Sequence, residues 1–292
     1  MSIILEMFSP DFLLKEALYG SFLLGLTCPL AGIYLILRRM VLFGIALPQI
    51  SSAGIAFAYL LHTVGIHIFP HEDPERTMAM TGSLTFTFIA IIALVAVERR
   101  GFTLNDSHIG SAYAVAAALS ILFVAANPFG EREILSLLKG EVLGMLPNDL
   151  PLLIVTTSLI ALCLLFFQRF FTLVSFDPTM AITMGKNVPA WNLFLFGLIG
   201  VLVAHGVILV GPLMIFGFLI LPAIAAHQIS MFYAWGIQKF SLLAAIFGGL
   251  SSLIGFYLSL RFDLPLGPTD VTAAFAVLIF TTMWTKFVRT RT

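Results

Sequence analysis

The sequence predicts an all-α membrane protein with about eight or nine transmembrane helices, and two observations lead to this fold class. Of its 292 residues, 60% are hydrophobic and only 10% are charged, whereas a soluble domain carries about 25% charged residues. The mean hydropathy of +1.05 reflects apolar runs, whose lengths approach the roughly 20 residues that cross a bilayer. A soluble globular enzyme and a disordered chain are therefore excluded, and a formal net charge of zero offers no basic surface for nucleic acid.

Nine spans are expected in chain order, and polar connections separate most of them. The span at 212–227 directly follows Gly211-Pro212, a break that membranes tolerate where neighbouring protein satisfies the freed backbone groups. If the segment 12–37 lay in the interface instead, eight spans would remain. No repeat or soluble domain is visible, so residues 1–292 are expected to form a single transmembrane domain without a cleaved signal peptide. The expected spans are 12–37, 44–66, 78–97, 108–126, 149–168, 191–210, 212–227, 240–260 and 270–286.

The basic residues indicate how the chain is oriented in the membrane. The loops at 38–43, 98–107, 169–190 and 228–239, with the C-terminal tail, hold ten of the 15 basic residues but only three of the 15 acidic ones. This side therefore carries a net charge of +7, and the opposite side carries −7. Because cytoplasmic loops are rich in Lys and Arg, we expect the C-terminus in the cytoplasm and, with nine spans, the N-terminus outside.

The expected spans offer few groups that could drive or catalyse a reaction. Every Asp, Glu, Lys and Arg falls in a loop or near a helix end, whereas an ionisable group at the bilayer centre would mark a proton- or sodium-coupled transporter. Gly185-Lys186-Asn187 lacks the upstream glycine of a phosphate-binding loop, and no His-Glu-x-x-His or Gly-x-Ser-x-Gly motif occurs. The chain is therefore not expected to be an enzyme, and a separate ATPase is expected to energise transport. A membrane enzyme and a secondary transporter are the alternatives from other classes.

Several short motifs follow one another along the chain. They are Leu37-Arg38-Arg39-Met40, Gly44-Ile45-Ala46-Leu47, Asp106 before Ile109-Gly110, Ser175-Phe176-Asp177-Pro178, Leu221-Pro222-Ala223 with Ala226, and Leu264-Pro265 with Gly267-Pro268. In this order and spacing they resemble the integral-membrane permease of manganese-, zinc- and iron-type ABC importers, a family related to the cobalamin and siderophore permeases. The resemblance extends over nearly the whole chain.

The resemblance implies a permease subunit of the bacterial inner membrane that imports zinc, manganese or iron. Its partners would be a second permease copy or a paralogue, two cytoplasmic ATPases that bind ATP, and an external binding protein that delivers the substrate. The permease itself would need no cofactor of its own. The outer loops 67–77 and 127–148 would receive the binding protein.

The resemblance also implies which residues contact the ATPase. Residues 224–239 would form an amphipathic coupling helix, because buried aromatic side chains contribute strongly to interfaces. Residues 175–190 would form a second cytoplasmic contact, in which Asp177-Pro178 suits a helix start and Gly185 a helix end. Without the resemblance, the aromatic residues of 224–239 would favour an amphipathic helix at the headgroup level. The expected contact residues are Gln228, Phe232, Tyr233, Trp235, Lys239 and Asp177.

The sequence departs from the resembled family at the metal site. Manganese and zinc permeases of that family usually begin the second span with Gly-Asp-Ala-Leu-Ser-His, in which the Asp and the His coordinate the metal. Here Ile45 and Gln49 occupy these positions, and isoleucine cannot supply the carboxylate or imidazole donor that a divalent ion prefers. Either other residues bind the metal, or the substrate is a metal chelate or small organic ligand. The expected path is neutral and polar, with Gln49, Ser51, Ser52 and His205 along it.

A group of His and acidic residues lies at the outer end of the second expected span and in the loop that follows it. His67 and His71 are four residues apart, which places both on one face if the segment is helical. Capture of an incoming metal is one interpretation, and a solvated loop beside the binding-protein surface is the other. The residues concerned are His62, His67, His71, Glu72 and Asp73.

Overall fold

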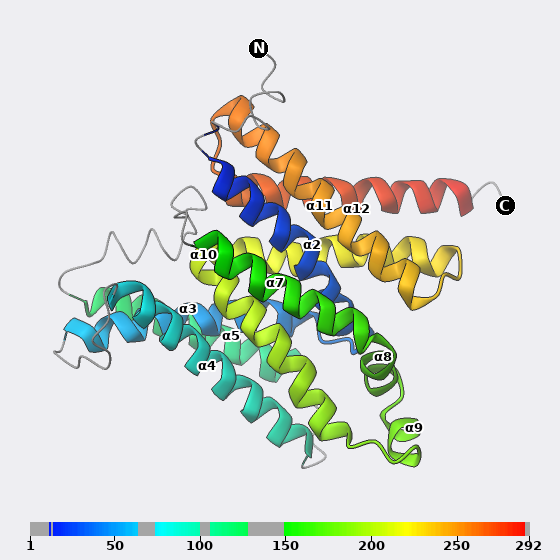
Figure 1. Ribbon diagram of the computed structural model, residues 1–292, viewed down its shortest axis with the longest axis horizontal. Coiled ribbons are helices and arrows are strands. Elements are labelled where there is room, and N and C mark those ends of the chain that lie inside the picture. Colours follow the sequence, from blue (N-terminus) through cyan, green and yellow to red (C-terminus); the bar gives the residue numbers. More distant parts are fainter. Residues whose placement is uncertain (1–11, 13, 64–73, 100–105, 128–148, 290–292) are drawn as a thin grey trace. The chain divides into compact units, whose positions relative to one another are not determined.

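Figure 1 shows the computed structural model, which describes residues 12, 14–63, 74–99, 106–127 and 149–289. Within these residues the regular elements are helices, and eight of them are long and apolar enough to cross a membrane. The all-α polytopic fold predicted from composition is therefore confirmed. The chain forms two compact units: unit 1 comprises 1–37, 141–166 and 213–292, and unit 2 comprises 38–140 and 167–212.

Unit 1 is built from α2 (Lys15–Leu37), α7 (Asp149–Phe166), α11 (Ile237–Phe262), α12 (Leu266–Arg289) and the later part of α10 (Val188–Phe232). α11 packs along α2 and α12, and α2 also packs on α7. Glycines let α2 and α11 approach closely, since a Cβ on Gly25 would lie 2.8 Å from the carbonyl oxygen of Gly248. α2 is buried along most of its length, so it is a core helix of unit 1 and not the interfacial segment of the eight-span alternative.

Unit 2 contains α3 (Val41–Thr63), α4 (Pro74–Arg99), α5 (Asp106–Ala125), α8 (Gln168–Phe176), α9 (Pro178–Thr183) and the first part of α10. α3 packs against both α4 and α5. The α3–α4 contact is tight at Gly54 and Gly82, where a Cβ on either glycine would meet the carbonyl oxygen of the other. Phe57 of α3 fills the neighbouring space, with its ring centre 5.3 Å from that of Phe86 and 5.2 Å from that of Phe123.

α10 combines two of the expected spans, 191–210 and 212–227. It has 45 residues, and a straight helix of that length would be about 68 Å long, more than twice the hydrocarbon thickness of about 30 Å. Gly211 interrupts the helix with φ 79° and ψ 164°, a conformation that glycine adopts readily because it has no Cβ. The predicted break at Gly211-Pro212 is therefore confirmed. Because α10 covers two of the expected spans, the nine expected spans correspond to eight described helices.

The separate helix expected over 224–239 is not present. α10 continues to Phe232, α11 begins at Ile237, and only residues 233–236 connect them. Within this turn Ala234 has a φ of 50°, and the Trp235 amide donates to the Ser230 carbonyl oxygen at 2.9 Å. The prediction of a separate helix was wrong because most of residues 224–239 belong to the two long helices α10 and α11. The aromatic side chains therefore lie around the tight turn between them.

Candidate functional site

The segment from α8 to Gly185, here called the α8–α9 segment, has well-defined helix ends. Asp177 separates the two helices, and its carboxylate accepts a hydrogen bond from the Met180 backbone amide at 2.8 Å. This is an N-cap, and Pro178 at the first helical position adds a fixed φ. Gly185 follows α9 with a φ of 71°, the left-handed conformation in which glycine commonly ends a helix. The predicted helix start and helix end are both confirmed.

Four apolar side chains of the α8–α9 segment are exposed, and we call them the α9 surface. They are Phe176, Met180, Ile182 and Met184, with exposed fractions of 78%, 52%, 63% and 57%. Ala181, on the other side of α9, is completely buried. A group of exposed apolar side chains on a short helical connection is typical of a surface that binds another protein.

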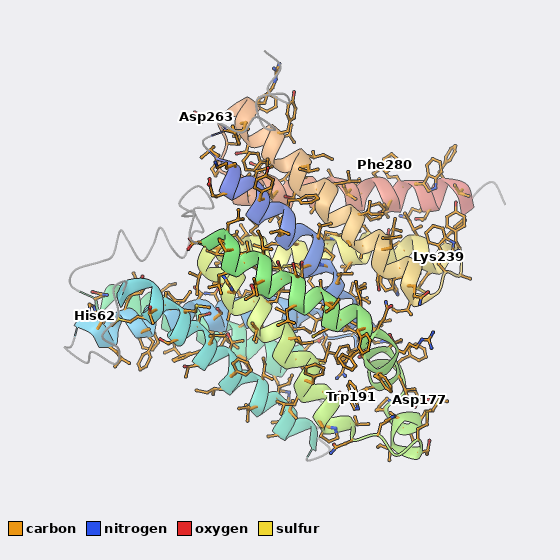
Figure 2. All side chains as sticks on the ribbon, in the orientation of Figure 1. His62, Asp177, Trp191, Lys239, Asp263 and Phe280 are labelled. Atoms are coloured by element: carbon orange, nitrogen blue, oxygen red, sulfur yellow. The ribbon has the colours of Figure 1, made fainter. Side chains whose placement is uncertain are left out.

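An aromatic stack holds the end of the α8–α9 segment against α10. The Lys186 ammonium lies 4.9 Å from the ring centre of Phe170 on α8. Phe170 stacks on Trp191 of α10, with ring centres 4.9 Å apart and ring planes at 11°. A cation–π contact and an aromatic stack each contribute on the order of 1 kcal/mol. Figure 2 shows Trp191 and Asp177 together at one end of unit 2, with His62 at the opposite end.

Arg38 gives the α8–α9 segment a second anchor within unit 2. Its Nε donates to Ser175 Oγ at 3.0 Å, and its Nη2 donates to Asn192 Oδ1 at 2.6 Å. The guanidinium carbon also lies 5.0 Å from the ring centre of Phe196. Hydrogen bonds from a charged donor are stronger than neutral ones, so Arg38 fixes the C-terminal end of α8 to α10.

The connection between α10 and α11 carries another exposed group, here called the aromatic turn. The Tyr233 and Trp235 rings stack with centres 5.5 Å apart, and Phe232 meets Tyr233 edge-on at 4.9 Å. The Lys239 ammonium, labelled in Figure 2, lies 5.7 Å from the Trp235 ring centre. Tyr233 and Trp235 remain 47% and 37% exposed, so they can still contact a second protein or lipid headgroups.

The residues that replace the expected metal pair lie on one face of α3. Ile45 and Gln49 are about one helical turn apart, and both are half-buried. Gln49 Nε2 donates to Ser120 Oγ on α5 at 3.1 Å. The next polar residues of α3, Ser51 and Ser52, are completely buried in unit 2. The structure therefore joins Gln49 to Ser120, a partner that no local sequence pattern indicates.

A buried polar chain continues from Ser51 to α10. Ser51 Oγ lies 2.6 Å from Ser83 Oγ on α4, and Ser83 donates to the Ala204 carbonyl oxygen at 3.0 Å. His205 is the next residue of α10 and is also buried. Thr87, one turn beyond Ser83, is completely buried, and its Oγ1 makes no hydrogen bond with the residues that the structure describes. The four predicted path residues thus all belong to unit 2, on α3 and α10.

The predicted external metal-capture group is only partly visible. His62 is half-buried in the last turn of α3. The other four residues, His67, His71, Glu72 and Asp73, lie outside the described residues. Within the described ranges, no three His, Cys, Asp or Glu side chains are grouped so that they could hold a metal ion. External metal capture therefore stays a prediction.

The sequence profile of the ABC 3 transport family matches residues 11–286. The chain belongs to this family. The ABC 3 chain is 28% identical over 261 residues to the manganese transport system membrane protein MntC of Listeria innocua, covering 89% of this chain and 86% of MntC. It is 27% identical over 276 residues to the zinc transport system membrane protein TroC of Treponema pallidum, covering 93% of this chain and 88% of TroC.

The ABC 3 fold is also found in a solved structure, PsaBC from Streptococcus pneumoniae in complex with Fab. The match has a TM-score of 0.76 and covers 93% of this chain and 91% of the other, at 23% sequence identity. Together with the family match, it confirms the predicted importer-permease architecture. The ABC 3 chain is a multi-pass permease subunit of an ABC importer, which translocates substrate and leaves ATP hydrolysis to a separate ATPase subunit.

Sequence reasoning missed the anchors of this ABC 3 permease. Arg38 is part of the Leu37-Arg38-Arg39-Met40 motif, but this motif does not indicate the partner Asn192, which is 154 positions away in the sequence. Lys186 was visible only as a lysine beside Gly185. The stacking of Phe170 on Trp191 had no local signal, since a chain with 28 Phe residues offers many equivalent rings. Partners of this kind are chosen by the packing of helices and not by neighbouring residues.

Proposed function

We propose that this ABC 3 permease imports a transition metal, such as manganese or zinc, across the bacterial inner membrane. The observation that carries the proposal is the similarity to named manganese and zinc transport permeases over 89% and 93% of this chain. A second permease copy or a paralogue completes the translocation path, two ATPases supply energy, and an external binding protein delivers the substrate. The positively charged side and the C-terminus face the cytoplasm.

The substrate path runs beside α3 in unit 2. Gln49 Nε2 uses one of its two N–H groups on Ser120, so the carbonyl oxygen Oε1 and the second N–H remain to contact a substrate. Ser51, Ser52 and His205 are buried in the same unit. This assignment rests on the position of Gln49, half-buried on a polar face of a helix that is otherwise apolar.

A metal chelate is the second candidate substrate, and the residues at the expected metal pair favour it. Ile45 offers no donor atom, and Gln49 offers only a neutral oxygen. A bare divalent ion loses its hydration shell on binding and needs several nitrogen or oxygen ligands in its place. A chelator brings those ligands with it, so a neutral path suits a chelate.

Uptake by intact cells tests both candidates. We would express the permease with its ATPase and binding protein in a bacterium without other metal importers, and measure accumulation of manganese, zinc and iron, each free and chelated. ATP-dependent accumulation of one of these is expected. Gln49→Ala should lower its rate by roughly fivefold, the equivalent of one hydrogen bond of about 1 kcal/mol.

Ser111→Ala is the matched control for Gln49→Ala, because the exposed Ser111 hydroxyl bonds only to its own helix at the His108 carbonyl oxygen. Its uptake should equal that of the wild type. Strong uptake of free manganese or zinc that Gln49→Ala leaves unchanged would contradict the assigned path. No transport of any of these metals or chelates would contradict the proposed function.

The ATPase binds chiefly to the α9 surface, with the aromatic turn as the second contact. The α9 surface is apolar and exposed, and Asp177, Lys186 and Arg38 hold its shape. A rigid, preformed surface loses less conformational entropy on binding. Among the expected contact residues, Lys239 is exposed. Gln228 instead accepts a hydrogen bond from Thr282 Oγ1 at 2.8 Å and belongs to the packing of α10 on α12.

Asp177→Ala should weaken ATPase binding through the conformation of α9. The substitution removes the acceptor for the Met180 amide, and loss of an N-cap costs about 1 kcal/mol, or roughly fivefold in the population of the helical form. We therefore expect a roughly fivefold rise in the Kd of the ATPase, measured with the permease in nanodiscs. Asp177→Asn keeps a capping oxygen and should bind almost normally. Equal losses in both variants would show that the charge, and not the cap, is what the ATPase needs.

A further inference from the structure

Asp270 is an acidic residue completely buried inside unit 1. It lies on α12, four residues after the helix begins at Leu266, which is about 6 Å along the helix axis. In the sequence it falls near a helix end, and in the structure it is enclosed by neighbouring helices. An ionisable side chain inside a membrane-spanning helix is costly and usually has a function.

Asp270 belongs to a cluster of three polar side chains, to which α2, α11 and α12 contribute one each. Ser21 of α2 and Ser252 of α11 are both completely buried. Ser21 Oγ lies 2.6 Å from Asp270 Oδ2 and 2.7 Å from Ser252 Oγ. The three side chains therefore form one continuous hydrogen-bonded chain from α12 through α2 to α11.

The second carboxyl oxygen, Oδ1, makes no hydrogen bond with the residues that the structure describes. It packs against α11 at Gly255, in the space that a side chain there would fill. A Cβ on Gly255 would lie 2.6 Å from Asp270 Cα and 2.9 Å from Asp270 N. Gly255 therefore allows α11 to approach α12 closely at Asp270.

No positive side chain among the described residues balances Asp270, whose hydrogen bond to Ser21 is its one polar contact in that part of the chain. His227 of α10 lies instead against the Phe240 ring. Lys15 and Arg261 are exposed at the ends of α2 and α11. An ionised carboxylate without a counter-charge would be strongly destabilising in this environment. The other ionisable side chains of the packed helices are Glu16, Tyr19, Cys28, Tyr34, Asp149, Cys163, Lys239, Tyr257, Asp263 and Lys286.

We propose that Asp270, Ser21 and Ser252 form a proton-binding site inside the membrane, in a different unit from the substrate path at Gln49. With the proton on Oδ2, this atom donates to Ser21 Oγ, and Ser21 donates in turn to Ser252 Oγ. The carboxyl group is then neutral and needs no counter-ion, and Oδ1 is an ordinary carbonyl oxygen. Separation of the three helices would let water reach Asp270 and release the proton, so proton binding is tied to the packing of α2, α11 and α12.

Infrared spectroscopy of the purified full-length permease in nanodiscs tests the site directly. A protonated carboxylic acid has a carbonyl stretching band that a carboxylate lacks. We expect this band in the wild type at neutral pH, its loss in Asp270→Asn, and its shift to higher frequency in Ser21→Ala, where a hydrogen bond is removed. Asp263→Asn, at an exposed position, is the control and should keep the band.

Two outcomes of the infrared experiment would overturn the proposal. The first is an identical carboxylic-acid region in the wild type and Asp270→Asn, which would mean that Asp270 is ionised. The second is a band that appears only in sodium-free buffer, which would make sodium the bound cation. Thermal unfolding adds an independent readout: Asp270→Asn should unfold near the wild-type temperature, and Asp270→Ala well below it. Equal losses in both variants would contradict a neutral hydrogen-bonded Asp270. Thr281→Ala, which removes a buried hydroxyl bonded only within α12, controls for loss of a polar group.

Discussion

Gly54→Ala is expected to lower the free energy of unfolding by about 3 kcal/mol, the upper end of what overpacking usually costs. The added methyl group would meet the Gly82 carbonyl oxygen and lie 2.9 Å from the Gly82 carbonyl carbon and 2.8 Å from Phe86 Cβ. Backbone atoms of α4 cannot rotate away as a flexible side chain could, so α3 and α4 must separate. Chemical or thermal unfolding of the permease in detergent measures the loss, and we also expect a lower yield of folded protein.

Gly110→Ala is the matched control for Gly54→Ala. Gly110 also lies within a helix of unit 2, but a Cβ there would have nothing within 4 Å. Alanine favours the helix over glycine by up to about 1 kcal/mol, so the control should be neutral or slightly stabilising. The two substitutions add the same methyl group, but only Gly54→Ala should lower the free energy of unfolding. A Gly54→Ala variant as stable as Gly110→Ala would show that α3 and α4 are not in contact at this position.

The double substitution Met180→Asp with Ile182→Asp is expected to abolish uptake without unfolding the permease. Both side chains are more than half exposed on the α9 surface, so their removal leaves the helix packing of unit 2 intact. In the proposed complex they are buried against the ATPase, and loss of two apolar contacts amounts to at least about 3 kcal/mol. This corresponds to a weakening of more than about a hundredfold in Kd. Co-purification of the ATPase and uptake by cells measure the effect.

Thr179→Asp is the control for the double substitution. Thr179 is exposed on the same helix and is not part of the α9 surface. Thr179→Asp therefore adds one negative charge to α9 without removing an apolar contact. It should retain most ATPase binding, and both variants should unfold at the wild-type temperature. Normal co-purification of the double variant would remove α9 from the interface and leave the aromatic turn as the contact.

Local signals predicted much of the fold. The apolar runs placed the long helices, and the Asp177-Pro178 pair and Gly185 marked the two ends of α9 because capping and left-handed φ are properties of single residues. Gly211-Pro212 marked the break in α10 for the same reason. The coupling helix over 224–239 failed as a prediction because helix ends depend on where packing stops, and α10 and α11 are supported by unit 1 nearly up to the turn.

The candidate site was predicted less completely than the fold. Gln49 was singled out because it replaces an expected ligand, but its contact with Ser120 spans 71 positions of sequence. Arg38 and Asn192 are 154 positions apart. In helices that are apolar on nearly every face, periodicity does not say which face meets which neighbour. Polar partners across helices therefore could not be assigned beforehand.

The sequence by itself determined that this chain crosses a membrane and that ATP is hydrolysed by a separate subunit. Composition, charge distribution and motifs suffice for these because each depends on residues taken singly or on their near neighbours. The tertiary structure alone decided that Asp270 is enclosed with Ser21, a residue 249 positions away, and that α9 presents an apolar surface. Both depend on which helix faces are covered, and burial is a property of the packed helices and not of any local stretch of chain.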